Sequence, residues 1–421
     1  MVKKQKGWIY FPVEVKVREM EAKLLLAYYA VKEGYDVVIG DHIMVELASE
    51  KYPKGIFFSK GYPHGFRRRV ITNAKDNGHI IVELDEEGLL VKDKKYLRDR
   101  MRRDMLTFVR QEYCWGQFQR EVITKAYPEY KEKCHTTGNP RFDLLKPKFR
   151  SIYQEEAEQL KTRFGEFILI NTRFSLYNTV KGMKDNVHFK HIKSLYYHFL
   201  EMIKATCEQF PYTNIVIRPH PGENFESYRK TFAKYSNVHV IHEGNIIKWL
   251  LAAKAIIHNG CTSGIEGYLL GKPVISYVPY HVPDSADVLP NQLGEKATNI
   301  EQLHKVLTVE LNRKCIDTNS NDNVKCIDNL FNYCEWSQDT FAYDAILRLC
   351  NTIVLAPSKP IKYPKTIHSS QIKSKKKRKR RFSLTELEIE EFFEKLHHIE
   401  DDDSIVKIKE IGKNVFHIQT E

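Results

Sequence analysis

The stretch AIIHNGCTSGIEGYLLGKPVISY, residues 255–277, sets two apolar runs on either side of a cluster of small polar residues. AIIHN predicts a buried strand, GIEGYLLG a helix and PVISYVP a second strand, which is the order of a parallel βαβ unit. The first N–H groups of a helix lack partners and the helix dipole is positive there. The turn from Gly260 to Gly264 therefore predicts a phosphate site. The alternative is a tight turn with a capping serine and no ligand.

The residues of this turn suit a phosphorylated nucleoside. Gly260 and Gly264 let the backbone approach a ligand closely, while Thr262 and Ser263 offer hydroxyl donors. Glu266 lies in the first helical turn, where its carboxylate can accept hydrogen bonds from ribose hydroxyls. The residues expected to hold a donor molecule here are His258, Asn259, Gly260, Thr262, Ser263, Gly264 and Glu266.

A second polar turn follows the apolar strand in NIVIRPHPGEN, residues 214–224. Arg218 and His220 come at the end of this strand, and the flanking prolines stiffen the backbone around the histidine. Arginine suits bidentate contact with phosphate, and histidine can donate to a phosphate or protonate a leaving group. We expect both side chains at a donor phosphate; the alternative is a surface histidine without a role.

The first part of the chain has an acidic turn in VELDEEGLL, residues 82–90. A carboxylate at the end of a strand can deprotonate an acceptor hydroxyl or attack an anomeric carbon. The candidate catalytic residues are Asp85, Glu86 and Glu87, together with His220. Glu14, Lys16 and Arg18 follow another strand and are expected on the acceptor side. The alternatives are a solvated acidic turn and a salt-bridged surface.

Strands and helices alternate twice along the chain, which predicts an α/β protein with two parallel-sheet domains. A cleft between two such domains is the usual ligand site. The expected boundaries are an acceptor domain at 1–145, a nucleotide-donor domain at 146–350, a linker with a basic run at 351–381, and a helix with a hairpin at 382–421.

The composition excludes several other classes of protein. The eight cysteines form no Cys-x-x-Cys pair and no ligand spacing with histidine, so neither a disulfide framework nor a metal site is expected. The chain has no apolar run of membrane-spanning length and no signal-peptide pattern. We therefore expect a cytoplasmic protein. The sequence also has no Asp-x-Asp pair on a loop between strands, no Walker lysine loop and no Gly-x-Gly-x-x-Gly fingerprint, so we expect no cofactor and no essential metal.

The net charge of +12 is concentrated in KSKKKRKRR, residues 373–381, which has eight basic residues. The following segment, SLTELEIEEFFEKLHHIE, predicts an amphipathic helix that begins with a capping box of Ser383 and Glu386. Residues 373–399 together suit an anionic membrane surface on the inner face of the cytoplasmic membrane. A solvated linker is the alternative, and no nucleic-acid module accompanies the run. The last residues predict a hairpin around Gly412.

With these motifs in hand, the chain resembles the bacterial surface carbohydrate biosynthesis protein family, whose members look like GT-B glycosyltransferases. The resemblance covers about residues 7–295 and rests on WIYFPVEVKVREMEAKLLLA, LDEEGL, TTGNPRFDLL, FILINTRF, VIRPHPGEN and WLLAAKAIIHNGCTSGIEGYLLGKPVISY. The acidic turn with the His-Pro motif is also similar to transferases that use CMP-activated Kdo or sialic acid. That likeness implies Glu86 or a neighbour as the catalytic carboxylate, His220 at the donor phosphate, and Thr262 and Ser263 beside it.

The resemblance implies a metal-independent glycosyltransferase of capsule or lipopolysaccharide synthesis. It would move a sugar from a nucleotide-activated donor to a glycan or a lipid-linked glycan. A CDP-polyol phosphotransferase of the teichoic-acid type is the first alternative, and a nucleotide-sugar epimerase is another. A GT-B-like protein that binds without catalysis is the alternative outside the enzymes.

Overall fold

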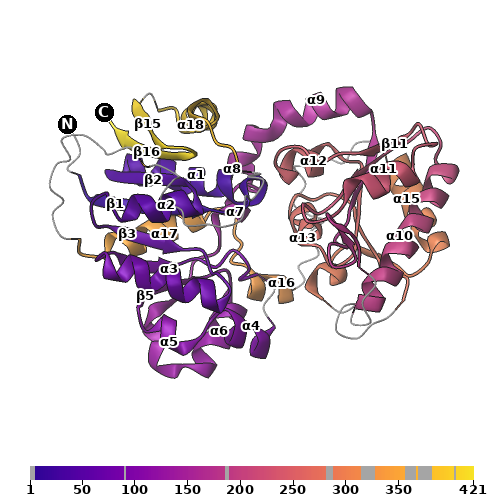
Figure 1. The fold of residues 1–421 in the computed structure, drawn as a ribbon. Helices are drawn as coiled ribbons and strands as arrows, with labels where there is room; N and C mark the ends of the chain where they lie inside the picture. Colours follow the sequence, from indigo (N-terminus) through magenta and orange to yellow (C-terminus); the bar gives the residue numbers. More distant parts are fainter. Residues whose placement is uncertain are drawn as a thin grey trace. The chain divides into compact units, whose positions relative to one another are not determined.

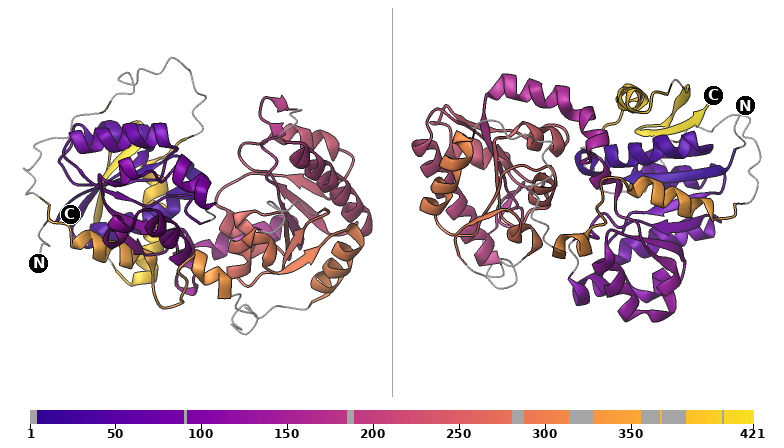
Figure 2. Two further views of the ribbon diagram at one scale, coloured as in Figure 1. Left: turned by 90° about the horizontal axis from the view of Figure 1, so that it is seen from below. Right: turned by 180° about the vertical axis from the view of Figure 1, so that it is seen from behind.

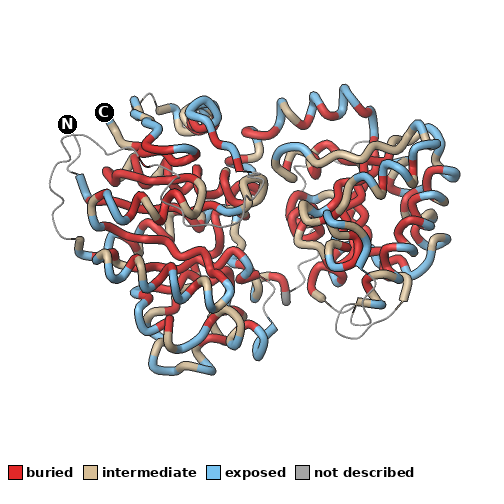
Figure 3. The backbone as a smooth tube through the Cα atoms, in the orientation of Figure 1, coloured by how far each residue is buried: buried red, intermediate tan, exposed pale blue. Residues whose placement is uncertain are grey.

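The computed structural model describes residues 5–89, 92–184, 189–280, 288–313, 328–355, 367, 382–402 and 404–421. The chain forms two compact units (Figure 1). Unit 1 consists of Met1–Ile152 and Asp328–Glu421, and unit 2 consists of Tyr153–Ile327. Each unit is built on one large sheet whose strands are mostly buried (Figure 3).

The sheet of unit 1 has six parallel strands and an antiparallel extension at one edge. The order of its strands is β15-β16-β2-β1-β3-β4-β5-β6. Every residue of β1 is buried, as expected for a strand covered on both faces. The bounds are β1 Gly7–Val13, β2 Tyr35–Asp41, β3 Ile56–Ser59, β4 Ile80–Glu83, β5 Val109–Cys114, β6 Cys134–Thr136, β15 Val406–Gly412 and β16 Val415–Thr420.

Helices cover both faces of this sheet because the side chains of each strand alternate between the faces. Trp8 and Tyr10 belong to the core formed with α2 and α3, whereas Phe11 points to the other face and contacts Phe58. The helices of unit 1 are α1 Lys16–Lys32, α2 His42–Ser49, α3 His64–Asp76, α4 Asp93–Asp99, α5 Arg103–Leu106, α6 Gln117–Ala126, η1 Pro128–Lys133, α7 Pro140–Asp143, α8 Pro147–Arg150, α16 Asp328–Tyr333, α17 Ala342–Asn351 and α18 Glu386–Glu400.

The chain returns to unit 1 after unit 2, which differs from the expected boundaries of 146–350 for the second domain. Helix α17, which follows unit 2 in the sequence, lies in unit 1 (Figure 2). It packs on α1, where the ring centroids of Tyr29 and Tyr343 are 3.8 Å apart. The buried carboxylate of Asp143 accepts from the backbone N–H groups of Ala342 and Tyr343 at 3.0 and 2.9 Å. Residues 328–350 were assigned to the wrong domain, because the apolar face of a helix does not identify the surface that it covers.

The C-terminal helix and hairpin form as predicted, but they are part of unit 1. The hairpin β15–β16 extends the sheet through pairing of β16 with β2. The apolar face of α18 packs on α1, with the ring of Phe393 5.3 Å from that of Tyr28, so this face is not open to lipid. The capping box is formed by Thr385 and Glu388 and not by the predicted pair. The basic run 373–381 lies outside the described residues.

Unit 2 has a six-stranded parallel sheet in the order β11-β10-β7-β12-β13-β14. Its first strand, β7, lies in the interior, with β10 and β11 on one side and the later strands on the other. This is the strand order of the Rossmann fold, which reverses direction between β7 and β12. The strands are β7 Phe167–Asn171, β10 Asn214–Arg218, β11 Val238–Val240, β12 Ala255–His258, β13 Val274–Tyr277 and β14 Glu295–Ala297, and β8 Asn178–Thr179 with β9 Gly182–Met183 forms a separate hairpin.

Seven helices of unit 2 fall within the described residues. They are α9 Gln154–Phe164, α10 Lys190–Gln209, α11 Phe225–Thr231, α12 Ile246–Ala252, α13 Thr262–Leu269, η4 Leu289–Gln292 and α15 Ile300–Asn312. The predicted α/β class with two Rossmann-like parallel-sheet units is confirmed. In the part of the chain that the structure describes, no helix is long and apolar enough to cross a membrane.

Candidate functional site

The turns that follow β7 and β12 meet where the strand order of unit 2 reverses. The guanidinium of Arg173 donates from Nη1 to the carbonyl oxygen of Gly260. Gly260 has a φ of 60°, and a Cβ at this position would lie 2.7 Å from Arg173 Nη1. The N–H of Gly260 donates to Asn291 Oδ1 at 2.5 Å. The turn is therefore held from two sides, while Arg173 itself remains exposed at the carboxyl edge of the sheet.

Helix α13 begins beside this contact. Its N-cap residue, Cys261, makes no side-chain cap, so the cap does not occupy the first N–H groups of the helix. Thr262 is partly exposed at the first helical position, whereas the buried hydroxyl of Ser263 donates to the sulfur of Cys261 at 3.0 Å. The predicted turn thus leads into a helix start without a side-chain cap. Thr262 is the more accessible of its two hydroxyl donors.

His258 and Asn259 shape the turn from inside. His258 is fully buried, hydrogen-bonds Ser276 Oγ through Nε2 at 3.2 Å, and accepts at Nδ1 from the N–H of Cys261 at 3.4 Å. Burial, with the nearby charge of Arg173, lowers the pKa of His258 to about 3, so the ring is neutral. Asn259 Nδ2 donates to the carbonyl oxygen of Tyr277 at 2.7 Å. This geometry favours a supporting role over the predicted phosphate contact, because both side chains are already engaged inside the fold.

Arg218 is also directed into the protein. Its guanidinium donates to the carbonyl oxygens of Glu243 at 2.9 Å and Gly244 at 2.6 Å, in the loop after β11. Burial lowers the pKa of Arg218 to about 10, against the opposing charges of Glu243 and Glu266. Glu266 is itself buried. The geometry thus favours loop support for Arg218 over the predicted phosphate contact, and the burial of Glu266 disfavours its predicted contact with a ribose.

His220 stands at the surface. Its Nδ1 accepts from the N–H of Gly222 at 3.1 Å, so a neutral ring has its proton on Nε2. The N–H of His220 donates to Glu223 Oε1 at 3.1 Å. The same carboxylate accepts from Thr172 Oγ1 at 2.8 Å and from the hydroxyl of Tyr228 at 2.5 Å. Glu223 therefore joins the turn after β10 to the turn after β7.

Sequence reasoning missed the residues that hold these turns together. The predicted candidates do not include Arg173, Thr172, Glu223 or Asn291. One signal was present for Arg173, because it follows the apolar strand FILIN by one threonine, much as Arg218 ends NIVIR. The structure thus brings together Arg173, Gly260 and Thr262, and it ties the turn of His220 to the turn of Arg173 through Glu223.

The three carboxylates of the acidic turn in unit 1 have different surroundings. Asp85 is fully buried and pairs with Arg100, from Nη2 at 2.6 Å and from Nε at 3.0 Å. Glu86 is buried and pairs with Lys23 at 2.9 Å. Glu87 is exposed and accepts from Arg18 Nη1 at 2.7 Å. Among the three predicted catalytic carboxylates, only Glu87 is therefore accessible.

A charged group, here named the Lys60 cluster, occupies the carboxyl edge between β1 and β3. The buried ammonium of Lys60 lies 2.9 Å from Glu14 Oε2 and 3.3 Å from Glu19 Oε1, and Arg18 Nη2 lies 3.2 Å from Glu19. Burial opposes the charge of Lys60, but Glu19 and Glu14 outweigh it and raise its pKa. The cluster consists of Glu14, Arg18, Glu19, Lys60 and Glu87.

The cluster contains two of the three predicted acceptor-side residues. Lys16, the third, pairs with Glu388 of α18. Lys60 and Glu19 were not predicted. Within the described residues, no group of three or more histidine, cysteine or acidic side chains could hold a metal ion.

Comparisons with known proteins identify the fold. No family model matches the chain, and no curated protein sequence matches it. Among solved structures, the UDP-GlcNAc 2-epimerase of Methanocaldococcus jannaschii has a TM-score of 0.53 at 13% identity, over 83% of this chain and 100% of that one. The Neisseria meningitidis UDP-GlcNAc 2-epimerase bound to UDP-GlcNAc gives 0.51 at 12% identity, over 83% and 99%.

A variant of a wall teichoic acid polymerase has a TM-score of 0.50 at 10% identity, over 83% of this chain and 89% of that one. At these identities the likeness concerns the fold alone. It confirms the expected GT-B-like fold class.

Proposed function

We propose that this chain is an enzyme that acts on a nucleotide-activated sugar in the synthesis of cell-surface glycans. One observation carries the proposal: Arg173 and the uncapped start of α13 lie together where the strand order of unit 2 reverses. In open α/β sheets this is the place where ligands bind, and a helix start with an adjacent guanidinium suits phosphate. The structural neighbours named for UDP-GlcNAc are consistent with a nucleotide sugar as the ligand.

The reaction we propose is transfer of the sugar to a glycan acceptor. The bond between the anomeric carbon and the phosphate oxygen breaks, and a bond to an acceptor hydroxyl oxygen forms. A carboxylate takes the acceptor proton, and Glu87 is the candidate because it is the exposed acid of its turn. Arg173, the N–H groups of α13 and His220 stabilise the charge of the departing nucleotide, without a metal ion.

The donor we propose is a CMP-activated acidic sugar. This choice rests on the resemblance of the acidic turn and the His-Pro motif to Kdo and sialic acid transferases. The structural neighbours favour two other chemistries, epimerisation of UDP-GlcNAc and assembly of a teichoic acid. The experiment must therefore separate the three reactions.

The test is to incubate the full chain with CMP-sialic acid, CMP-Kdo, UDP-GlcNAc and CDP-glycerol, with and without a glycan acceptor. Release of CMP from a CMP-sugar together with a lengthened acceptor supports the proposal. Conversion of UDP-GlcNAc without an acceptor assigns an epimerase, and CMP release from CDP-glycerol assigns a polyol phosphotransferase. If none of the nucleotides raises the thermal midpoint or is consumed, the proposal is wrong.

A further inference from the structure

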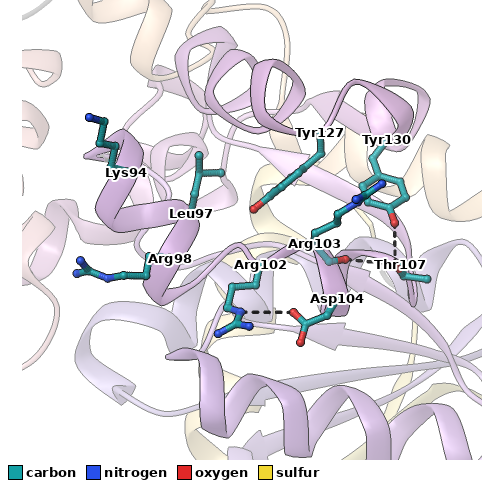
Figure 4. Close-up of a pocket in the computed structure, with 9 residues that line it drawn as sticks. All are labelled: Lys94, Leu97, Arg98, Arg102, Arg103, Asp104, Thr107, Tyr127 and Tyr130. Atoms are coloured by element: carbon teal, nitrogen blue, oxygen red, sulfur yellow. Dashed lines mark hydrogen bonds and ion pairs between the residues drawn. The ribbon is translucent and has the colours of Figure 1, made fainter.

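Unit 1 has a second concave surface, whose lining includes none of the predicted site residues. It is a depression of about 800 Å³, within the range of ligand-binding pockets, formed by α4, α5, the end of α6 and η1 (Figure 4). We name it the arginine pocket. Its lining residues are Lys94, Leu97, Arg98, Arg102, Arg103, Asp104, Thr107, Tyr127 and Tyr130.

The charge of the arginine pocket is strongly positive, with four basic side chains and one carboxylate. Arg98 and Arg103 are each balanced by an acid on the rim, Asp99 at 2.6 Å and Glu129 at 2.7 Å. Arg102 and Lys94 are less well balanced than these two.

The nearest acid to Arg102 is Asp104 at 3.6 Å, and that carboxylate already pairs with Arg68 at 2.5 Å. Lys94 has no ion-pair partner among the described residues. These two cations are therefore available to an anionic ligand.

Two tyrosines supply flat apolar surface beside these cations. Tyr130 is fixed by a hydrogen bond of 2.6 Å between its hydroxyl and Thr107 Oγ1. The ring of Tyr127 projects into the space between Leu97 and Arg103, and its hydroxyl has no partner among the residues that the structure describes (Figure 4). A ring face with a polar tip, in the same pocket as a guanidinium whose nearest acid lies 3.6 Å away, suits a sugar ring that carries an acid.

We propose that the arginine pocket binds an anionic glycan segment, whose separate carboxylates or phosphates contact Arg102 and Lys94 while a sugar ring packs on Tyr127. The acids on the rim argue against a nucleic acid. Asp99 and Glu129 already balance Arg98 and Arg103, which leaves two cations, too few for the row of phosphates that a nucleic acid presents.

The wall of the pocket is connected to the acidic turn of unit 1. Arg100, which follows α4, binds the buried carboxylate of Asp85 and also donates to the carbonyl oxygen of Gly61. Arg67, paired with Glu83 on β4, reaches the carbonyl oxygen of Arg102 at 3.5 Å. A glycan in the pocket would thus be held on the same rigid support as the turn that presents Glu87. The role of the pocket as the subsite for the acceptor rests on the proposed function. Its ability to bind an anionic glycan does not depend on that function.

The test is calorimetric titration of the full chain with three trimers: of sialic acid, of glycerol phosphate and of glucose, the last being the neutral maltotriose. We expect one or both acidic trimers to bind, and maltotriose to bind at least tenfold more weakly. R102A and Y127A should each weaken the acidic trimer about tenfold, while R348A on the exposed side of α17 leaves the affinity unchanged. The two acidic probes show whether carboxylate or phosphate is preferred.

Three results would overturn the inference: no binding of either acidic trimer, equal binding of the neutral one, or tighter binding of a uridine decamer. Equal affinities of R102A and R348A would also overturn it. Thermal midpoints of the variants show whether they are folded. Nucleotide binding at Arg173 is measured on the same samples. If the chain binds a nucleotide but no acidic trimer, only this inference is rejected. If it binds an acidic trimer but no nucleotide, only the proposed function is rejected.

Discussion

Arg173 donates to the carbonyl oxygen of Gly260 and so joins the turns after the two strands between which unit 2 reverses its strand order. The contact fixes an exposed guanidinium next to the start of α13, whose N-cap makes no side-chain cap. A glycine suits position 260, because its φ of 60° strains other residues and a Cβ there would displace the guanidinium 2.7 Å away. Arg173 is therefore the residue of unit 2 on which the proposed nucleotide site most depends.

The variant R173A should weaken nucleotide binding by a factor of about ten to a hundred, because a charge-assisted contact with phosphate is lost. The measurement is calorimetric titration with whichever nucleotide raises the thermal midpoint. R229A is the matched control, since Arg229 is exposed on α11 and pairs only with Glu226 among the described residues. Equal affinities of the two variants would remove Arg173 from the site.

Gly264 should not tolerate a side chain, because a Cβ there would lie 2.3 Å from His258 Nε2 in a fully buried setting. We expect G264A to lower the free energy of unfolding by about 1–3 kcal/mol, the usual effect of overpacking. G65A is the control, since nothing lies within 4 Å of a Cβ at that position. Scanning calorimetry gives both values, and an unchanged midpoint for G264A would show that His258 can move away.

The sequence predicted the fold class well because apolar runs and small-residue turns are local signals. It could not tell which polar side chain of a turn faces the solvent. Arg218 and Arg173 both come at the end of apolar strands, yet Arg218 binds the backbone carbonyls of Glu243 and Gly244 while Arg173 is exposed. The partner that decides this lies 25 residues or more away along the chain.

Long-range packing explains the other differences. The apolar stripe of α18 is visible in the sequence, but its partner, α1, is more than 350 residues away. Helix α17 also packs on α1, which is far away in the sequence, and this packing places α17 in unit 1 and not in the second domain. In the acidic turn, the sequence shows three adjacent acids. It does not show that the first, Asp85, pairs with Arg100 and that the second, Glu86, pairs with Lys23.

The buried histidine of the turn predicts an acid-sensitive unit 2. The pKa of His258 is about 3 in the folded protein, below the ordinary value of 6.5, so only the unfolded chain binds a proton between these values. Stability is therefore lost as the pH falls from 6.5 towards 3, by on the order of a few kcal/mol. We expect the urea midpoint of H258N to fall less between pH 7 and pH 5 than that of the unsubstituted chain. An equal fall in the urea midpoint of H258N and of the unsubstituted chain would contradict this.

Glu112 should have the opposite pH dependence in unit 1. It is fully buried on β5 beside Glu83 of β4, and its carboxylate oxygens have no hydrogen-bond partner among the described residues. Burial, then the charge of Glu83, raises its pKa well above 4.5. The unfolded chain loses this proton first, so stability is lost as the pH rises above 4.5. E112Q should be relatively more stable at pH 8 than at pH 5, and a difference that is independent of pH would show that Glu112 does not titrate.

The apolar face of α18 should act on stability and not on membrane binding. Phe393 is 2% exposed against α1, so F393A should lower the free energy of unfolding by about 3–5 kcal/mol. L387A on the same helix should have almost no effect, because Leu387 is 60% exposed. Thermal midpoints and co-sedimentation with phosphatidylglycerol vesicles are measured for both variants. Weaker co-sedimentation of F393A at an unchanged midpoint would mean that the helix leaves α1 to meet lipid, contrary to this structure.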